Sequence, residues 1–496
     1  MKRSDLVFWL SIIVMVLMII ILVVVYFVLD LDTQYYQPGS TWIQSPSDWT
    51  MPPAQIQHEK AADIKPHLLP AYRIELTSNQ MASFLKPTSD GGCLAIAQIQ
   101  ADETSDAGTA AQSIQATRFW SNGTVRWTRQ YDDLLINGYL VALCVLPDDS
   151  FALSLRSSGL KPANPIMHDQ LLRFAPDGRL IWQTPATAND SMESLRAGSL
   201  DFLLAADDGA VLATGTVQSS PADETGDSDI SLIRFEADGR QSATMLVGRS
   251  GQDYLSSATF QGDTGLVLIW QQTTGQTQPG EDIAFGQTSK ICCYDQMLQE
   301  QWVTTLPKGT MLNEVQITPD GKDILAFGTA PADASVGEPS TTGEARSTLY
   351  RLDSQGKIQW FYQTPEPRAW LAAAARQTSG SFIVGWHQPT PEQGERSTLL
   401  LLDAGGQVQS EIDRSPGIVR QLIPTLDGGV TAVCQQSVQP VPQPIFISSI
   451  WTDTEAIVSH YDRTQQLVWR RTIDQYRGVR QTDHVVATTR DTLLVG

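Results

Sequence analysis

The stretch RLDSQGKIQW, residues 351–360, decides the fold because variants of it return along the chain. It contains β-forming residues, a turn with Gly356, further β-formers and a tryptophan, which together predict a β-hairpin. The other variants are TRFWSNGTVRW ending at Trp127, LLRFAPDGRLIW at Trp182, LIRFEADGR at Arg240, CYDQMLQEQW at Trp302, LLLLDAGGQV at Val408 and HYDRTQQLVW at Trp469. The sequence therefore predicts a repeat protein.

The turns and their spacing define the repeated unit. Several turns contain a dipeptide that suits a type I′ turn, in which two residues have positive φ. These dipeptides are Asn122-Gly123, Asp177-Gly178 and Asp238-Gly239. A second hairpin signal, such as DDGAVLATG at residues 207–215, lies between the variants. Because the turns recur every 50 to 61 residues, we expect four-stranded antiparallel blades and an all-β propeller.

The two ends of the repeat region are expected to share one blade. The segment AYRIELT, residues 71–77, is typical of an outermost strand, since Tyr72 precedes Asp90 by the same 18 residues that separate Trp302 from Asp320. Its inner partners would be the hairpin HVVATTRDTLLVG at residues 484–496. Such sharing closes the ring and removes exposed sheet edges. We expect eight blades over residues 70–496, with seven as the alternative.

One tryptophan position recurs four residues after the turn. The tryptophans are Trp127, Trp182, Trp302, Trp360 and Trp469, and the turn glycines are Gly123, Gly178, Gly239, Gly356 and Gly406. Ala243 and Ser410 replace the tryptophan in two variants. A ring that binds one central ligand has no need of the same residue in every blade, so these tryptophans are interpreted as packing between blades.

The pattern LDSQGKIQW, with Gly356 and Trp360, resembles the tryptophan-docking repeat of the pyrroloquinoline-quinone-type eight-bladed propellers. These include quinoprotein alcohol dehydrogenases and the non-catalytic scaffold of the Bam complex. The segment SDGGCLAIA followed by TRFWSNGTVRW is also similar to bacterial surface repeats of the DGG…GW type. The resemblance covers about residues 70 to 496 and implies a fold without fixing an activity.

Enzymatic members, as the resemblance implies, hold a quinone and Ca²⁺ on the ring axis beside an adjacent-cysteine disulfide. Cys292-Cys293 invites that comparison, but the pair lies in the predicted strand KICCYDQ and no cluster of Asp, Glu and Asn ligands accompanies it. No catalytic, cofactor-binding or metal-binding residue is therefore assigned. Cys93, Cys144 and Cys434 lie in apolar runs and are interpreted as buried free thiols.

The N-terminal region predicts a membrane anchor. Residues 6–29 contain no charged side chain, and a helix of that length spans about 36 Å, enough to cross a bilayer. The run is longer than a cleavable signal peptide requires, so it is interpreted as an uncleaved signal anchor. Lys2 and Arg3 place residues 1–5 in the cytoplasm and the rest of the chain outside. Residues 30–69 are rich in proline and predict an extracytoplasmic stalk.

Charge and loop length indicate where a partner would bind. The formal net charge of −20 disfavours nucleic acid as a partner. In each blade, the long loop between the second and third strands lies on the face opposite the short turns, and long loops on a rigid scaffold commonly bind partners. Candidate residues on these loops are Asp102, Glu103, Asp106, Asp223, Glu224, Asp227, Asp229, Glu281 and Asp282. They indicate a surface for a basic partner or Ca²⁺, or simply solubilising charge.

These observations predict a single-pass membrane protein that displays a propeller at the cell surface. Its expected role is non-catalytic binding, scaffolding or sensing, with a protein or another envelope component as the partner. Two alternatives stay open. One is a quinoprotein-like or other enzyme with an axial active site, and the other is a structural surface module without a specific small ligand.

Overall fold

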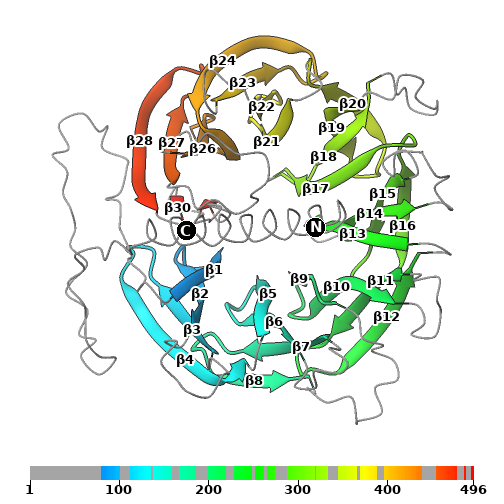
Figure 1. Ribbon diagram of the computed structural model, residues 1–496, viewed down its shortest axis with the longest axis vertical. Coiled ribbons are helices and arrows are strands. Elements are labelled where there is room, and N and C mark those ends of the chain that lie inside the picture. Colours follow the sequence, from blue (N-terminus) through cyan, green and yellow to red (C-terminus); the bar gives the residue numbers. More distant parts are fainter. Residues whose placement is uncertain are drawn as a thin grey trace, which may run out of the picture. The chain divides into compact units, whose positions relative to one another are not determined.

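The apolar runs that flank each turn form antiparallel β-strands in the computed structural model (Figure 1). The structure describes residues 80–100, 112–135, 138–158, 167–184, 199–218, 228–248, 252–261, 265–273, 287–318, 320–332, 345–365, 369–387, 396–425, 427–437, 454–476, 485–487 and 493–495. All of these belong to one unit, His58–Gly496. In those ranges, no helix has the length and apolar character that crossing a bilayer requires. The predicted anchor and stalk, residues 6–29 and 30–69, lie outside them.

The strands fall into groups of four that follow one another along the chain. The first group contains β1 (Gln80–Pro87), β2 (Cys93–Gln100), β3 (Gln112–Phe119) and β4 (Val125–Leu135). The second contains β5 (Gly138–Val145), β6 (Phe151–Ser158), β7 (Met167–Phe174) and β8 (Leu180–Gln183). The third contains β9 (Phe202–Ala205), β10 (Val211–Gln218), β11 (Ser228–Phe235) and β12 (Gln241–Val247).

The later groups have the same order. The fourth contains β13 (Gln252–Gln261), β14 (Gly265–Thr273), β15 (Gln287–Tyr294) and β16 (Glu300–Thr305). The fifth contains β17 (Met311–Ile317), β18 (Asp323–Pro331), β19 (Ala345–Asp353) and β20 (Ile358–Gln363). The sixth contains β21 (Trp370–Arg376), β22 (Phe382–His387), β23 (Arg396–Leu402) and β24 (Val408–Pro416). The seventh contains β25 (Ile418–Pro424), β26 (Val430–Ser437), β27 (Thr454–Tyr461) and β28 (Leu467–Tyr476).

Each group is an antiparallel sheet whose strands pair in sequence order. The third and fourth groups are joined into one eight-stranded sheet by a single parallel pair, Ser228 with Gln252. The first strand of each group lies toward the common centre and the fourth lies at the outside (Figure 1). Successive groups are in contact through strands such as β1 with β5, β5 with β9 and β21 with β25. This blade-like arrangement confirms the predicted all-β class and four-stranded unit.

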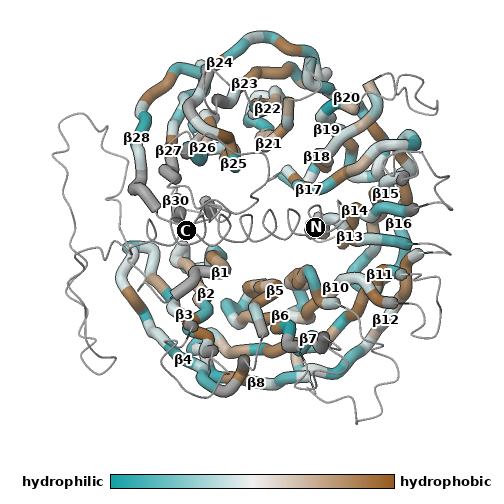
Figure 2. Tube along the Cα trace, viewed as in Figure 1, coloured by the Kyte–Doolittle hydropathy of each residue, from teal (hydrophilic) through white to brown (hydrophobic). Residues whose placement is uncertain are grey.

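Burial explains why the strands differ in composition. The third strands lie between neighbouring sheets and are buried on both faces, as the nearly continuous burial of β11 shows. The fourth strands alternate between partly buried and exposed residues, as β12 does, because one face meets solvent. Hydrophobic segments occur in every sheet (Figure 2). Ile96 and Ile114 of the first sheet share one core with Leu153 and Phe174 of the second, so each blade buries its surface against the next.

The hairpin turns correct one prediction. At Ala175 to Arg179, Gly178 donates its backbone N–H to the carbonyl of Ala175, and Ala175 donates to Arg179. Gly178 has φ +81°, while Asp177 has no positive φ. The same holds for the dipeptides at Gly123 and Gly239. The predicted type I′ turn is therefore wrong, because a three-residue loop, a type I turn ending in one left-handed residue, joins these strands.

The recurring tryptophan lies on the left-handed residue of the next sheet. Trp302 of β16 donates from Nε1 to the carbonyl of Ser354 at 3.1 Å, in the β19–β20 turn. A Cβ on Gly356 of that turn would lie 2.2 Å from the Trp302 ring, so only glycine fits. The same indole hydrogen bond, at 2.9 to 3.0 Å, joins Trp127 to Pro176, Trp182 to Ala237 and Trp360 to Ala404. These four tryptophans confirm the predicted packing between blades.

In two blades, other residues replace the tryptophan and the left-handed glycine of the next sheet. Where Ala243 replaces the tryptophan, the left-handed residue of the next sheet is Leu298, with φ +63°. Leu298 is 3% exposed, and its core cluster includes Ala243. Where Ser410 replaces it, the left-handed residue is Gln465, with φ +64°. At the first of these two places, the small Ala243 on one sheet is therefore matched by the larger Leu298 on the next, which fills space between the two blades.

Buried arginines form a second contact between blades at the short-turn face. Arg118 is 1% exposed and its Nη2 lies 3.0 Å from Asp90 of its own sheet and 2.9 Å from Asp149 of the next. Three further arginines donate to backbone carbonyls of the following sheet, Arg173 to Gly209, Arg234 to Gln296 and Arg351 to Ala404. These charge-assisted bonds fix each turn against its neighbour.

The C-terminal hairpin agrees with the part of the shared-blade prediction that the structure describes. β29 (Val485–Ala487) pairs antiparallel with β30 (Leu493–Val495), and β29 contacts β1. The last strands of the chain thus lie beside the first described strand. Tyr72 and its proposed outer strand lie outside the described residues, as does the turn on which Trp469 would dock. The eighth blade therefore stays a prediction.

Replacing Gly356 by alanine is expected to destabilise the protein more than the same change at Gly380. Both glycines have positive φ, +76° and +88°, so both variants carry the backbone cost of about 1 kcal/mol. Only at Gly356 does the new methyl group meet the Trp302 ring, since a Cβ on Gly380 has no heavy atom within 4 Å. Urea unfolding of the full-length chain should show an additional loss of about 1–3 kcal/mol for Gly356→Ala. Equal losses would contradict the docking argument.

Exchanging the pair at Ala243 and Leu298 tests directly whether the two residues share one space. Ala243→Trp alone is expected to destabilise by about 1–3 kcal/mol, because Leu298 fills the place of the indole. Combining it with Leu298→Gly should recover part of that loss, giving a favourable coupling of about 1 kcal/mol or more in a double-mutant cycle. Strictly additive effects of the two substitutions would show that the two positions do not share one space.

Candidate functional site

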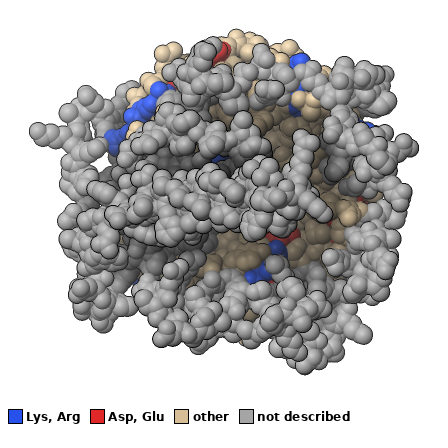
Figure 3. All heavy atoms as spheres, in the orientation of Figure 1, with Lys and Arg blue, Asp and Glu red and all other residues tan. Residues whose placement is uncertain are grey.

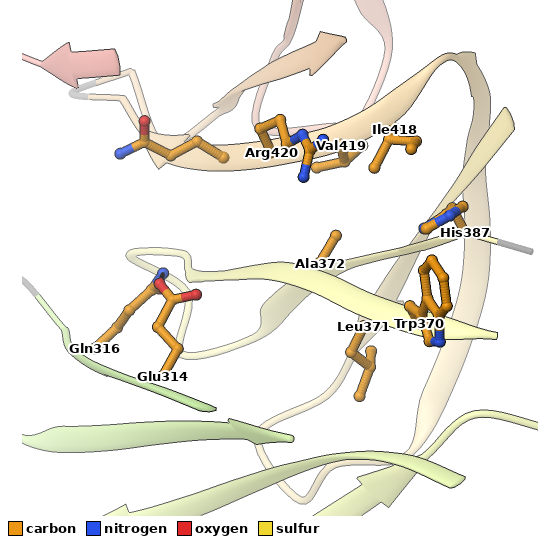
Figure 4. Close-up of a pocket in the computed structure, with 10 residues that line it drawn as sticks. Glu314, Gln316, Trp370, Leu371, Ala372, His387, Ile418, Val419 and Arg420 are labelled. Carbon is orange, nitrogen blue, oxygen red and sulfur yellow. Dashed lines mark hydrogen bonds between the residues drawn. The ribbon is translucent and has the colours of Figure 1, made fainter. Parts of the chain in front are cut away.

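A cavity opens between the first strands of the fifth, sixth and seventh sheets. Its volume is about 390 Å³, within the range of small-molecule sites. Its walls come from β17, β21, β25 and the end of β22 (Figure 4). The lining residues are Glu314, Gln316, Trp370, Leu371, Ala372, His387, Ile418, Val419, Arg420 and Gln421. Because these first strands lie toward the centre of the repeat, the cavity faces the axial side of the blades (Figure 1).

β-Bulges place several of these side chains in the cavity. In β25 the pairing with β26 passes from Val419 to Gln421, so Arg420 is an extra residue without a paired position. Ala372 is the corresponding extra residue of β21, and Asn313 that of β17, next to Glu314. A bulge bends its strand and redirects the local side chains. The site is therefore built by an irregularity that recurs in these three first strands.

Opposite charges face each other across the cavity without pairing. Arg420 and Glu314 point inward from opposite walls (Figure 4). Gln316 donates to Oε1 of Glu314 at 2.7 Å, and Arg420 donates from Nε to Oε1 of Gln435 at 3.0 Å. Both residues lie in the described part of the chain, where no ion pair joins them. Each charged group is thus held in place by a glutamine amide and directed at the space between them.

The environment of Glu314 changes its acidity. The side chain meets water inside the cavity, but the surrounding wall removes much of the bulk solvent. This desolvation raises the pKa of Glu314 above its usual value, and the hydrogen bond from Gln316 opposes the shift. Glu314 can therefore take up or release a proton at a higher pH than an ordinary surface carboxylate.

The other end of the cavity is aromatic and apolar. The Trp370 side chain is 56% exposed, whereas most tryptophan side chains in folded proteins are largely buried. His387 is 4% exposed and meets the Trp370 ring edge-on, with centroids 5.0 Å apart. Leu371 and Ile418 complete this end. The cavity therefore combines a flat apolar surface with two fixed, opposite charges, an arrangement suited to binding a small polar molecule with an apolar part.

The acidic loop residues predicted as a binding face are mostly untested. Asp102, Glu103, Asp106, Asp223, Glu224, Asp227, Glu281 and Asp282 lie outside the described residues. Asp229 lies near the start of β11, with its Oδ1 2.7 Å from the position of a Cβ on Gly248. Asp253 lies 2.5 Å from the same position, so two carboxylates converge at one glycine. Within the described ranges, no three side chains of His, Cys, Asp or Glu gather in a metal-binding arrangement.

The face seen in Figure 3 carries no continuous charged patch among its described residues. Among the described residues that this view shows, Lys, Arg, Asp and Glu appear in small groups (Figure 3).

Cys93, Cys144 and Cys434 are buried free thiols, as the sequence indicated. Cys93, Cys144, Cys292, Cys293 and Cys434 are all free and buried. Cys292 and Cys293 lie within β15 and point to opposite cores, since consecutive residues of a strand alternate between its faces. Burial raises the pKa of both thiols to about 11, so neither is a reactive thiolate at neutral pH.

Sequence reasoning missed the cavity residues, although one signal was present. When the six bulged first strands are superimposed by their bulges, the extra residues are Ser83, Val141, Ser256, Asn313, Ala372 and Arg420. The residues that follow are Phe84, Ala142, Ser257, Glu314, Ala373 and Gln421. Glu314 and Arg420 are the charged members of these two sets. They depart from the repeat in the two blades that flank the sixth sheet, which marks a local specialisation.

Comparison with known proteins gives only distant structural similarities. No protein-family profile matches the chain, and no curated protein matches it in sequence. Among solved structures, a prolyl endopeptidase has a TM-score of 0.44 and 10% identity, covering 84% of this chain and 54% of its own. Acylaminoacyl peptidase from Pyrococcus horikoshii has a TM-score of 0.41 and 11% identity, with 80% and 52% covered. The chain thus spans about half the length of these two peptidases.

A third similar structure is a periplasmic gluconolactonase from Pseudomonas aeruginosa, with a TM-score of 0.39 and 12% identity, covering 77% of this chain and 98% of its own. These similarities are to propeller-type folds at low identity. They do not confirm the resemblance to the pyrroloquinoline-quinone-type superfamily.

Stability should fall in alkaline solution because of the buried thiols. Burial raises the pKa of Cys434 from 9.0 to about 11, so the unfolded chain loses this proton before the folded chain does. The contribution is fully present below pH 9 and is lost as pH rises toward 11, by about 1.4 kcal/mol per pH unit for one thiol. Urea unfolding between these pH values should give a shallower decline for Cys434→Ala than for the unmodified chain. Identical slopes would contradict a raised thiol pKa in the fold.

Proposed function

We propose that the chain is a membrane-anchored, extracytoplasmic propeller that binds or senses a ligand without transforming it. The observation that carries this proposal is the cavity in which Glu314 and Arg420 face each other unpaired beside the exposed Trp370. Glu314 is desolvated by the cavity wall and gains no ion pair with Arg420, and each of the two charges is held by a glutamine amide. A ligand that supplies both counter-charges recovers that cost, so the arrangement favours binding.

The anchor and the blade number belong to the same proposal. The uncharged run at residues 6–29 with Lys2 and Arg3 before it supports a single N-in span, and residues 30–69 would then hold the propeller away from the membrane. The contact of β29 with β1 supports an eighth blade shared between the two ends of the repeat region. The acidic loops, including residues 101–113 and 219–229, would add a protein or envelope partner on the long-loop face.

A second candidate is an enzyme with an axial active site. One observation favours it, namely the raised pKa of Glu314, since a carboxylic acid that stays protonated nearer to neutral pH can act as a general acid. Among the ten lining residues of the cavity, Glu314 and His387 are the side chains that could act as a nucleophile, but His387 is 4% exposed and Glu314 already accepts a hydrogen bond from Gln316. The geometry supports binding more directly than covalent catalysis.

Binding and catalysis can be separated by following the fate of a bound compound. The full-length protein in detergent is screened against small metabolites by thermal shift, with Trp370→Ala as the pocket variant. Compounds that stabilise the unmodified chain but not the variant are then incubated with protein and analysed by mass spectrometry. We expect recovery of unchanged compound. Conversion that is abolished by Glu314→Gln would establish the enzyme instead, and hits unaffected by Trp370→Ala would exclude the cavity as the binding site.

The proposed topology predicts one-sided labelling. A single cysteine introduced in the stalk, for example at Ser47, should react with a membrane-impermeant maleimide in intact cells, because the stalk would lie outside the membrane. A cysteine introduced at Ser4 should react only after the membrane is opened. The five native thiols are buried and should contribute little background. Labelling of Ser4→Cys in intact cells would reverse the proposed orientation.

A further inference from the structure

The ligand class of the cavity follows from its charges, and this inference rests on the proposed binding function. We infer that the cavity takes a small zwitterion with an aromatic or branched apolar group, the chemistry of a free amino acid or a short peptide. Arg420 would meet the carboxylate, Glu314 the ammonium group, and Trp370 the apolar group. Each assignment comes from a different wall of the site (Figure 4).

The charged end is built to act on two opposite charges at once. A cavity for an anion would gain from a second cation, and a cavity for a cation would gain from a second carboxylate. Here one of each is present, and the two remain apart although both line the same space. Gln316 and Gln435 hold them by hydrogen bonds of 2.7 and 3.0 Å, so neither has to be reoriented when a ligand enters. Preorganised charges of this kind favour a ligand with matching, separated charges.

The repeat supplies an independent argument. The bulge in a first strand recurs in six blades, but Arg420 is the charged residue at its extra position and Glu314 the charged residue at the position that follows. A stabilising role common to the blades would favour one residue type in most of them, as it does for the docking tryptophans. The two charges instead occur in the blades that flank the sixth sheet, whose extra residue is the small Ala372. The small residue leaves space between the two charges.

The aromatic end selects the apolar part of the ligand. The Trp370 ring is more than half exposed, and its edge contact with His387 fixes its orientation at an interplanar angle of 71°. Leu371 and Ile418 offer only apolar surface beside it. An aromatic ring or a branched chain gains by stacking or packing there. A neutral sugar could also stack on the indole, but it would not use the opposed charges.

The test measures the binding of matched compounds to the full-length protein by isothermal titration calorimetry. The probes are L-phenylalanine and glycyl-L-phenylalanine, 3-phenylpropionate without the ammonium group, phenethylamine without the carboxylate, and glucose as a neutral sugar. We expect at least one zwitterion to bind, and each singly charged analogue to bind about tenfold to a hundredfold more weakly, the effect of one charged hydrogen bond.

Variants of the cavity test which residue recognises each charged group of the ligand. Glu314→Gln should remove the preference for the zwitterion over 3-phenylpropionate, and Arg420→Gln the preference over phenethylamine. Trp370→Ala should weaken the binding of all of these aromatic compounds. The matched controls are Arg240→Gln and Trp120→Ala, since both side chains are exposed and neither lines the cavity. The thermal unfolding temperature of every variant checks that the fold is retained.

Two outcomes would overturn the inference in different ways. If glucose binds in a manner that requires Trp370 but neither charge, the zwitterion assignment is wrong and the proposed binding function stands. If no zwitterion binds at millimolar concentration and the broader screen gives no compound that depends on Trp370, the cavity is not a binding site and both proposals fail.

Discussion

The whole fold depends on the fit between one side chain and the turn of the neighbouring blade. A four-stranded sheet of this kind cannot bury both faces alone, so each blade needs a defined position against the next. Trp302 provides that position by covering Gly356 and donating to Ser354, and the same geometry recurs at three other tryptophans. Because the indole excludes a Cβ at the turn, a single residue choice on one blade determines a residue choice on the next. Register between blades is thus encoded locally.

One blade without the tryptophan shows that the space between blades can be filled by a different pair of residues. Leu298 occupies a left-handed conformation that costs a branched side chain roughly 1 kcal/mol or more. It is nevertheless buried in the core cluster that includes Ala243, where the other blades have an indole. The gain in buried apolar surface, about 1.5–3 kcal/mol for a leucine, offsets the backbone cost. A strained backbone conformation at a turn is therefore offset when the side chain of the strained residue fills a space that would otherwise be empty.

The sequence predicted the parts of the molecule that are repeated. Alternating apolar residues, turn glycines and tryptophans each occurred several times, so chance matches could be discounted, and the strands and interblade packing followed. The turn type was wrong because an Asp-Gly pair is compatible with both a two-residue and a three-residue loop, and the choice depends on strand pairing. The cavity could not be predicted because it depends on β-bulges, and no single residue type in the sequence identifies where a bulge occurs. The charges of Glu314 and Arg420 became visible as exceptions only after pairing fixed which positions correspond.

The bulges have an evolutionary consequence. A regular strand residue is constrained on the backbone by its pairing and on the side chain by the sheet that covers it. An extra residue such as Arg420 has no position opposite it in the backbone pairing with the adjoining strand, so its side chain can change with little disturbance of the ladder. The same is true of Asn313 and Ala372. The repeated blades thus form a regular frame, and the bulges provide a few positions near its centre that the strand pairing does not constrain. Single substitutions at these positions could change what the cavity binds while the blades keep their architecture.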